Sequence, residues 1–336
     1  MVQLGQHPAP SHVVVHLSDP HVLAGEGRLY GRVDSAARLV AALERVEAAG
    51  LSPDAIVFTG DLADLGEAEA YRRLRGLVEP VAARLGSELV WCMGNHDERA
   101  PYARELFDEL EHGGGGSFGV APQDRVVEVR GLRIIALDTS VPGYHHGSLD
   151  RAQLDWLRRV LARPAEHGTL LALHHPPIPS PLTEAMSILE LEDQASLAEA
   201  IRGTDVRGIL GGHLHYSTQS SLEGIPVSVA SASCYTLALG LPDRILAGVD
   251  AHQAFQTIHV YPDRLVHTTV PIGGADPVSG YPAAALARIA SIPPAVRREL
   301  FSRKDSAFNV AEVLGDAEVA AAAAEAALAS LAGEAD

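Results

Sequence analysis

Cysteine is scarce in this sequence, which contains only Cys92 and Cys234 among its 336 residues. Two cysteines exclude a small secreted domain held together by many disulfides, and no CxxC pair indicates a zinc ribbon or a redox motif. No apolar run approaches the length that crosses a membrane, and residues 1–11 lack the basic start and apolar core of a signal peptide. We therefore predict a cytoplasmic protein without an integral membrane segment.

Positive charge is also in short supply, because 26 basic residues face 43 acidic ones and the formal net charge is −17. Such a surface repels a nucleic-acid backbone, so we do not expect a nucleic-acid polymer as partner. A small anionic substrate is easier to reconcile with this charge, because bound divalent metals can reverse the local field. The hydrophobic content of 47% is ordinary for a globular protein with a sizeable core.

The order of the predicted elements indicates an α/β fold. Short β-branched runs alternate with amphipathic segments up to about residue 210, and strands dominate afterwards. We predict strands at 13–17, 55–58, 89–93, 170–173, 206–210, 228–230, 257–261 and 265–271, a hairpin over 125–137, and helices over 34–49, 67–85, 150–161 and 194–202. This order predicts a largely parallel sheet and a second, mixed sheet packed against it.

The last part of the chain differs in character. Residues 282–303 are punctuated by proline, the stretch 297–304 is locally basic, and residues 317–336 are rich in alanine. We predict one large domain over residues 1–275 and a C-terminal appendage over 276–336 that is partly helical or disordered. A solvated tail is the favoured interpretation of its basic residues, and peripheral contact with an anionic surface is the alternative.

Residues of the types that bind metals fall at the ends of the predicted strands. They are Asp19 and His21, Asp61, Asn95 with His96, His174 with His175, and His213 with His215. Open α/β sheets place their sites at the carboxyl edge of the strands, so one convergent site is the simplest interpretation. Asp, His and Asn without thiolates suit Mn, Fe or Zn. Seven candidate ligands, counting one histidine of the 174/175 pair and leaving His96 aside, exceed the need of one tetrahedral zinc. The sequence therefore predicts two metal ions with a carboxylate between them.

These motifs occur in the order Asp-x-His, Gly-Asp, Gly-Asn-His-Asp, His and Gly-His-x-His over residues 19–215. Together they resemble the signature of the calcineurin-like metallophosphoesterases. Segments 29–31, 54–64, 137–143 and 211–217 are similar to the actinobacterial type of class III cyclic-nucleotide phosphodiesterase, which hydrolyses 3′,5′-cyclic AMP. The resemblance implies a four-layer α/β/β/α sandwich with two mixed β-sheets, in which residues 1–275 form the catalytic domain.

The resemblance also implies a metal-binding role for each matching residue. One ion would be held by Asp19, His21 and His215, the other by Asn95, His174 and His213, and both would share Asp61. The cofactors would be two divalent or trivalent ions of Fe, Mn or Zn. They would acidify a bridging water, and the resulting hydroxide would attack the phosphorus of cyclic AMP and give 5′-AMP.

Three of these positions would also serve the reaction itself. Asn95 would neutralise charge on the phosphate oxygens. His96 would contact the phosphate and protonate the leaving ribose oxygen. Asp64 would support a ligand histidine or His96.

Four side chains near these motifs have competing interpretations. The family pattern favours His174 over His175 as the ligand, and His175 would then support the site or pack beneath Pro176. The loop that carries His145 would contact the substrate, or its histidines would simply be exposed to solvent. We interpret Tyr235 as a core residue rather than as a platform on which a base stacks.

Alternatives remain for the function as a whole. A broad phosphodiesterase that prefers 2′,3′-cyclic nucleotides or other small diesters is the nearest alternative, and a pyrophosphohydrolase or a phosphoprotein phosphatase is more distant. A protein of another class would keep the fold without catalysis and bind a partner through its C-terminal tail. The resemblance also predicts a homodimer.

Overall fold

The computed structural model describes residues 5–109, 121–180, 182, 184–241, 244–274, 280 and 283–313. Residues Pro10–Gly274 form one compact unit, and the described residues before and after them belong to a second unit. Within the described ranges, no helix combines the length and the apolar character needed to cross a membrane.

The first sheet of the large unit contains five strands within the described residues. Their order is β13 (Leu265–Pro271), β12 (Ala254–Val260), β1 (His12–Leu17), β2 (Ala55–Thr59) and β3 (Glu88–Cys92). The strands β1, β2 and β3 are parallel to one another, whereas β12 pairs antiparallel with both β1 and β13. Every residue of β2 is buried, because this interior strand lies between β1 and β3 and is covered on both faces.

The second sheet has six strands in the part of the chain that the structure describes. Their order is β4 (Arg125–Val129), β5 (Leu132–Leu137), β6 (Thr169–Leu173), β7 (Val206–Gly211), β9 (Ile225–Val229) and β8 (Thr218–Leu222). The strands β5, β6, β7 and β9 are parallel, and β4 and β8 are antiparallel edge strands. A separate antiparallel hairpin is formed by β10 (Thr236–Leu241) and β11 (Arg244–Val249).

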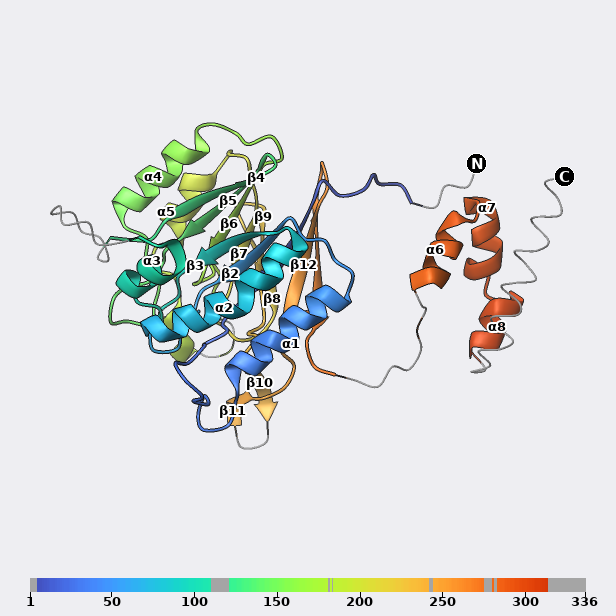
Figure 1. Ribbon diagram of the computed structural model, residues 1–336. Helices are drawn as coiled ribbons and strands as arrows, with labels where there is room; N and C mark the ends of the chain where they lie inside the picture. Colours follow the sequence, from blue (N-terminus) through green and yellow to red (C-terminus); the bar gives the residue numbers. More distant parts are fainter. Residues whose placement is uncertain are drawn as a thin grey trace. The chain divides into compact units, whose positions relative to one another are not determined.

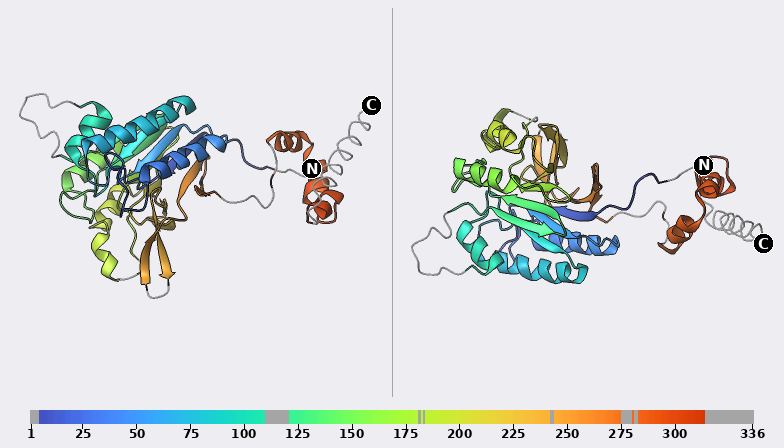
Figure 2. Two further views of the ribbon diagram at one scale, coloured as in Figure 1. Left: turned by 60° about the horizontal axis from the view of Figure 1, so that its bottom comes forward. Right: turned by 90° about the horizontal axis from the view of Figure 1, so that it is seen from above.

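Helices cover the outer faces of the two sheets (Figures 1 and 2). The first sheet packs against α1 (Ser35–Ala48), α2 (Ala68–Leu85) and α3 (Arg99–Phe107), and the second packs against α4 (Arg151–Leu161) and α5 (Gln194–Ile201). A third apolar core, with Val57 and Val90 from one sheet and Ile134 and Leu170 from the other, lies between the sheets. The predicted four-layer α/β/β/α sandwich with two mixed sheets is therefore confirmed.

Local sequence signals set the ends of several helices. Asp34 caps α1, because its side chain accepts a hydrogen bond from the backbone N–H of Ala37, and Gly50 follows the helix in the left-handed conformation. Asp150 and Gln153 form a reciprocal capping box at the start of α4. These caps lie where the sequence predicted the helices to begin and end.

Other elements were not predicted. They are α3, β8, the β10–β11 hairpin and a 3₁₀ helix at Glu184–Leu189. The second unit contains α6 (Ala283–Ser291), α7 (Pro294–Arg297), a π-helical turn at Arg298–Ser302 and α8 (Ala307–Val313). The alanine-rich segment 317–336 lies outside the described residues.

Candidate functional site

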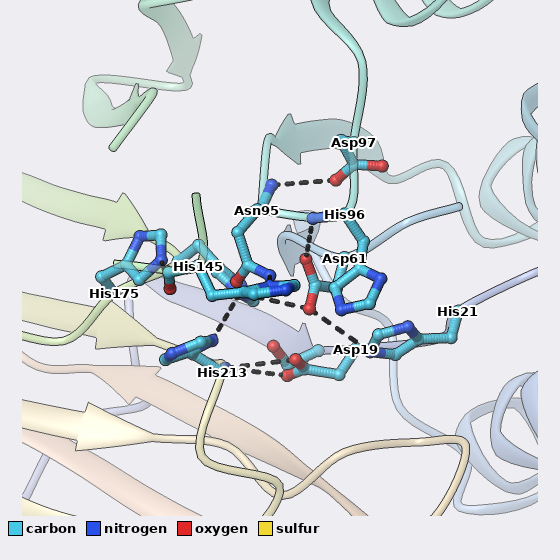
Figure 3. A network of polar contacts seen from close by, with 12 residues as sticks. Asp19, His21, Asp61, Asn95, His96, Asp97, His145, His175 and His213 are labelled. Carbon is cyan, nitrogen blue, oxygen red and sulfur yellow. Dashed lines mark hydrogen bonds and ion pairs between the residues drawn. The ribbon is translucent and has the colours of Figure 1, made fainter. Parts of the chain in front are cut away.

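The seven predicted metal ligands come from loops at the carboxyl ends of five strands, and the structure brings all seven together (Figure 3). They are Asp19 and His21 after β1, Asp61 after β2, Asn95 after β3, His174 after β6, and His213 and His215 after β7. Because β1–β2–β3 and β5–β6–β7 are parallel, these carboxyl ends meet at one edge of each sheet.

One half of the site consists of Asp19, His21, Asp61 and His215. All four are buried, and one ligand atom of each lies within 4.8 Å of the others. The Nε2 atoms of His21 and His215 are 3.2 Å apart. Oδ2 of Asp61 lies 3.3 Å from Nε2 of His21, and Oδ1 of Asp19 lies 3.5 Å from Nε2 of His215.

The other half is centred on His174. Its Nε2 atom lies 3.1 Å from Nδ1 of His213 and 3.0 Å from Oδ1 of Asn95. The same Nε2 atom is 3.3 Å from Oδ2 of Asp61. This one carboxylate oxygen therefore contacts an imidazole of each half, so Asp61 lies between the two groups of ligands.

Each of the four imidazoles is held from outside the site by one oxygen. The pairs are His21 Nδ1 with Asp64 Oδ1 at 2.9 Å, His174 Nδ1 with the Thr59 carbonyl at 2.8 Å, His213 Nε2 with the Leu189 carbonyl at 3.1 Å, and His215 Nδ1 with the Tyr235 carbonyl at 2.9 Å. Carbonyl and carboxylate oxygens accept hydrogen bonds, so these nitrogens carry the ring proton of the neutral imidazole. The opposite nitrogen of each ring then turns its lone pair inward, as a metal ligand requires.

The ionisation of these groups also suits a cation. Burial alone would raise the pKa of Asp61, but His174 and His21 hold that pKa well below its usual range, so the carboxylate stays ionised. Burial lowers the pKa of His213 and of His215, which keeps both rings in the neutral form that binds metals. Burial also acts to lower the pKa of His174, but Asp61 outweighs it and raises that pKa to about 9, so metal binding there displaces a proton. The donor atoms and their charge therefore fit metal ions.

His96 lies beside the ligands, with its side chain 31% exposed. Its backbone N–H donates to Oδ1 of Asp61 at 2.9 Å, and its Nδ1 donates to the carbonyl of Asp64 at 2.8 Å. Asp64 thus contacts His21 through its side chain and His96 through its backbone. Burial acts to raise the pKa of Asp64, but the hydrogen bond from His21, together with the charges of His21 and His96, leaves that pKa lowered.

His145 lies in the loop between β5 and α4, and its ring contacts Asn95 (Figure 3). Its Nδ1 lies 2.8 Å from Nδ2 of Asn95. The carbonyl of His145 in turn accepts a hydrogen bond from Nε2 of His175 at 3.1 Å, while Nδ1 of His175 lies 2.8 Å from Oγ1 of Thr139. Both ring nitrogens of His175 are therefore engaged outside the group of ligands, unlike those of His174.

Sequence reasoning assigned no task to Asp97, which is 6% exposed and joins two ligand-bearing loops. Its Oδ2 accepts the backbone N–H groups of Gly94 at 2.8 Å and Leu62 at 3.0 Å. Its Oδ1 accepts the N–H of Ala63 at 3.0 Å and the hydroxyl of Tyr71 at 2.9 Å. The loop that carries Asp61 is thereby fixed to the loop that carries Asn95. The sequence did contain a signal for this role, because Asp97 is the last residue of the Gly-Asn-His-Asp motif.

Cys234 and Tyr235 also lie closer to the site than the sequence suggested. The sulfur of Cys234 is within 4.8 Å of ligand nitrogens of His21 and His215, and burial raises the pKa of this thiol to about 12, so it stays protonated. Tyr235 packs against a small apolar cluster of Leu29, Val33, Ala232 and Cys234, which agrees in part with the prediction of a core residue. Its ring is only partly buried and packs against His215, with 4.5 Å between the ring centroids.

The backbone of the site is unusual. The left-handed conformation is adopted by Asp19 (φ 50°), His21 (φ 43°), Asp61 (φ 49°), His213 (φ 70°) and His215 (φ 55°). This conformation costs roughly 1–2 kcal/mol for each residue other than glycine, so the surrounding fold must enforce it. Part of that support is visible, because the N–H of His21 donates to the carbonyl of Asp61 at 2.9 Å and the N–H of His213 donates to the Asp19 carboxylate.

A family profile described as calcineurin-like phosphoesterase matches residues 12–217 of the chain. The matched segment is more than half of the chain and includes all seven candidate ligands. The chain belongs to the calcineurin-like phosphoesterases. The resemblance found in the sequence motifs is thereby confirmed.

Relatives extend this result beyond the profile. The chain is 53% identical over 306 residues to a Mycobacterium tuberculosis protein named cAMP/cGMP dual specificity phosphodiesterase, covering 89% of this chain and 94% of that protein. It is 47% identical over 274 residues to a probable cyclic nucleotide phosphodiesterase of Rhodococcus erythropolis, covering 81% and 87%. It is 33% identical over 237 residues to the 3′,5′-cyclic adenosine monophosphate phosphodiesterase CpdA of Pseudomonas aeruginosa, covering 69% and 80%.

Solved structures show the same fold at much lower identity. A dimetal phosphatase from Danio rerio has a TM-score of 0.56 and 15% identity, with coverage of 79% of this chain and 97% of that chain. A purple acid phosphatase from Lupinus luteus also has a TM-score of 0.56, at 12% identity, with coverage of 79% and 52%. At this level of identity, these two structures show that the fold is shared and do not identify the substrate.

Proposed function

We propose that this calcineurin-like phosphoesterase is a dinuclear metal-dependent phosphodiesterase that hydrolyses 3′,5′-cyclic AMP to 5′-AMP. The observation that carries the proposal is the position of Asp61 between two groups of inward-facing imidazole nitrogens. The names of the relatives at 53% and 47% identity support a cyclic nucleotide as substrate.

The metal-binding roles follow the two halves of the site. One ion would be held by Asp19, His21 and His215, the other by Asn95, His174 and His213, and Asp61 would serve both. The choice of His174 over His175 is supported by the hydrogen bonds that occupy both nitrogens of His175. Two such ions supply a water-derived nucleophile near neutral pH and positive charge beside the phosphate. Iron, manganese and zinc all suit these N and O donors, and metal analysis of the purified protein identifies which are bound.

The remaining residues bind the phosphate and move one proton. The His96 ring is oriented by the bond from Nδ1 to the Asp64 carbonyl, which leaves Nε2 to face the substrate. In our proposal, Nε2 of protonated His96 gives its proton to the ribose 3′ oxygen as the bond from that oxygen to phosphorus breaks. Asn95 and His145 contact the phosphate oxygens, and Asp64 keeps both His21 and His96 in place.

Product chromatography tests this function directly. The protein and its Asn95→Ala variant, loaded with manganese and in parallel with iron or zinc, are incubated with 3′,5′-cyclic AMP, 2′,3′-cyclic AMP and an aryl phosphodiester. We expect 5′-AMP from the first substrate and its loss in the variant. Turnover of the other diesters without 5′-AMP would favour the broad phosphodiesterase. No turnover under any of the three metals would favour a non-catalytic binding protein.

We also propose the organisation that the sequence predicted: a catalytic domain over residues 1–275, an appendage over 276–336, a cytoplasmic location and a homodimer. One compact unit is Pro10–Gly274 and the other combines residues 1–9 with 275–336, which supports the boundary near residue 275 but not the inclusion of residues 1–9. Deletion of residues 276–336 should leave turnover intact. Light scattering measures the dimer, and sedimentation with anionic vesicles measures any peripheral association that the tail confers.

A further inference from the structure

The metal centre has two chemically different flanks. On one flank, beside Asn95, lie the polar imidazoles of His96 and His145, whose ring centroids are 5.5 Å apart. On the other flank the His215 ring contacts Tyr235, and Tyr235 contacts Tyr30. The first flank suits phosphate oxygens and a leaving group. The second presents aromatic surface, for which the reaction itself has no use.

Tyr30 and Tyr235 form a fixed aromatic pair. Their ring centroids are 5.5 Å apart with an interplanar angle of 82°, and their hydroxyl oxygens are 3.1 Å apart. The pair is joined to the metal centre, because the Tyr235 carbonyl accepts a hydrogen bond from His215 at 2.9 Å. Tyr30 is nevertheless 78% exposed, although burial of such a ring is normally favourable. A solvent-facing aromatic surface beside the metal centre suits a flat ligand.

A cavity of about 720 Å³ opens at this pair. It is lined by both tyrosines, by Arg32 and Val33, and by residues of the β10–β11 hairpin that include Leu237 and Val249. Most of this lining is aromatic or aliphatic. Small-molecule sites are typically concave and apolar in this way, with few polar groups.

The polar groups of the cavity are largely committed elsewhere. The two tyrosine hydroxyls bond each other. The Asp250 carboxylate, which also lines the cavity, accepts two hydrogen bonds from Arg38 at 2.9 and 2.8 Å and one from Gln253 at 2.8 Å. Apart from the Arg32 guanidinium, which also lines the cavity, stacking and apolar contact are therefore the main means of recognition left to it. Stacking tolerates different bases because every base has a π face.

We propose that this cavity is the nucleobase subsite of the enzyme, in which the substrate's base stacks on the Tyr30 ring and meets the Tyr235 ring edge-on while its phosphate lies at the metal centre. This inference rests on the proposed cyclic-nucleotide function and adds to it the place and manner of base recognition. It implies that 3′,5′-cyclic AMP and 3′,5′-cyclic GMP have KM values within a few-fold of each other.

The test compares tyrosines on the two flanks. Tyr30→Asn removes the ring, and asparagine tolerates the left-handed backbone at this position (φ 52°). Tyr30→Phe keeps the ring and removes the hydroxyl. Tyr144→Ala is the matched control, because Tyr144 is 62% exposed on the loop that carries His145. KM and kcat are measured for cyclic AMP, cyclic GMP and methyl 4-nitrophenyl phosphate, which has no base.

We expect Tyr30→Asn to raise KM for both cyclic nucleotides at least about five-fold, the equivalent of ~1 kcal/mol for one lost base stack, with a smaller effect on the aryl diester. Tyr30→Phe and Tyr144→Ala should stay within two-fold of the wild type. Equal KM values in the wild type and Tyr30→Asn, or a larger effect of Tyr144→Ala, would overturn the subsite. A wild type that cleaves the aryl diester and neither cyclic nucleotide would instead overturn the proposed function, and the subsite with it.

Discussion

Nδ1 of His145 accepts a hydrogen bond from the side-chain amide of Asn95 at 2.8 Å, and this contact orients the amide. The NH₂ group points to His145, so the amide oxygen must face the metal centre, where it lies 3.0 Å from Nε2 of His174. An amide has one donor end and one acceptor end, and only the oxygen can bind a metal. A neutral His145 therefore selects the productive orientation of Asn95.

We predict that His145→Ala lowers turnover of cyclic AMP by about 10–100-fold, because outer groups that orient a ligand typically contribute that much. Formation of 5′-AMP is measured together with the metal content of the variant, so that a loss of turnover can be separated from a loss of metal. The adjacent His146→Ala is the control, since His146 contacts Tyr144 and Glu192 instead of Asn95. Equal losses in the two variants would argue against the orienting role.

A second prediction concerns Asp64, whose Oδ1 accepts the hydrogen bond from Nδ1 of His21. Asp64→Ala should weaken binding of one of the two ions by about 10–100-fold, because His21 loses the partner that orients its ring. Asp64→Asn keeps an acceptor oxygen and should retain most of the affinity. Competition with a chelator, followed by elemental analysis, measures both variants. Full occupancy of both ions in Asp64→Ala would contradict the prediction.

Glycine at position 212 is required for close packing of the ligand loops. A Cβ atom there would collide with Oγ of Ser18 and would lie 2.9 Å from Oδ2 of Asp19. We expect Gly212→Ala to displace Asp19 and lower turnover by about 100-fold or more, since small misplacements in an active site have effects of that size. Gly76→Ala is the matched control, because its Cβ would meet nothing within 4 Å inside α2. It should stabilise the protein by ~0.5–1 kcal/mol in a urea titration.

The pH dependence of stability should depend on His16, a fully buried residue of β1 that contacts Thr59. Burial, with a smaller contribution from His267, lowers the pKa of His16 from 6.5 to about 3. Between these values the unfolded chain binds a proton that the folded protein excludes. The free energy of unfolding therefore falls as the pH drops from 6.5 towards 3.

We predict that the wild type loses about 1.4 kcal/mol more than His16→Gln between pH 7.5 and pH 5.5. Urea titrations with a chelator present measure this difference without a contribution from metal release. His252→Asn is the control, because His252 is exposed and asparagine tolerates its left-handed backbone (φ 62°). Parallel pH profiles for wild type and His16→Gln would refute the assignment.

The candidate ligands could be predicted because they are local to the strands that carry them. Asp61 follows the apolar run Ala55–Thr59, and His174 follows Thr169–Leu173, so the residue type and the strand end are read from one short segment. Parallel strands then bring those ends together without further information. The edge strand β8 was missed because its residues, Thr218–Leu222, are polar and partly exposed and lack an alternating pattern.

Contacts between distant segments could not be predicted in this way. His145 and Asn95 are 50 residues apart, and Tyr30 and Tyr235 are 205 residues apart. No periodicity relates such positions, because their proximity depends on loop conformations that tertiary packing sets. For the same reason the sequence left His145 between two interpretations and did not reveal the contact between Tyr235 and His215.

The left-handed backbone at Asp19, His21, Asp61, His213 and His215 bears on how such a centre could be copied. A designer who grafts these five side chains, with Asn95 and His174, onto another α/β scaffold would start with relaxed loops, which direct the same residues elsewhere. The part that must be transplanted is the set of torsion angles, together with the two packed sheets that hold them against their intrinsic preference. The motif residues alone are therefore not sufficient for this chemistry, because the feature they depend on is the backbone conformation that positions them.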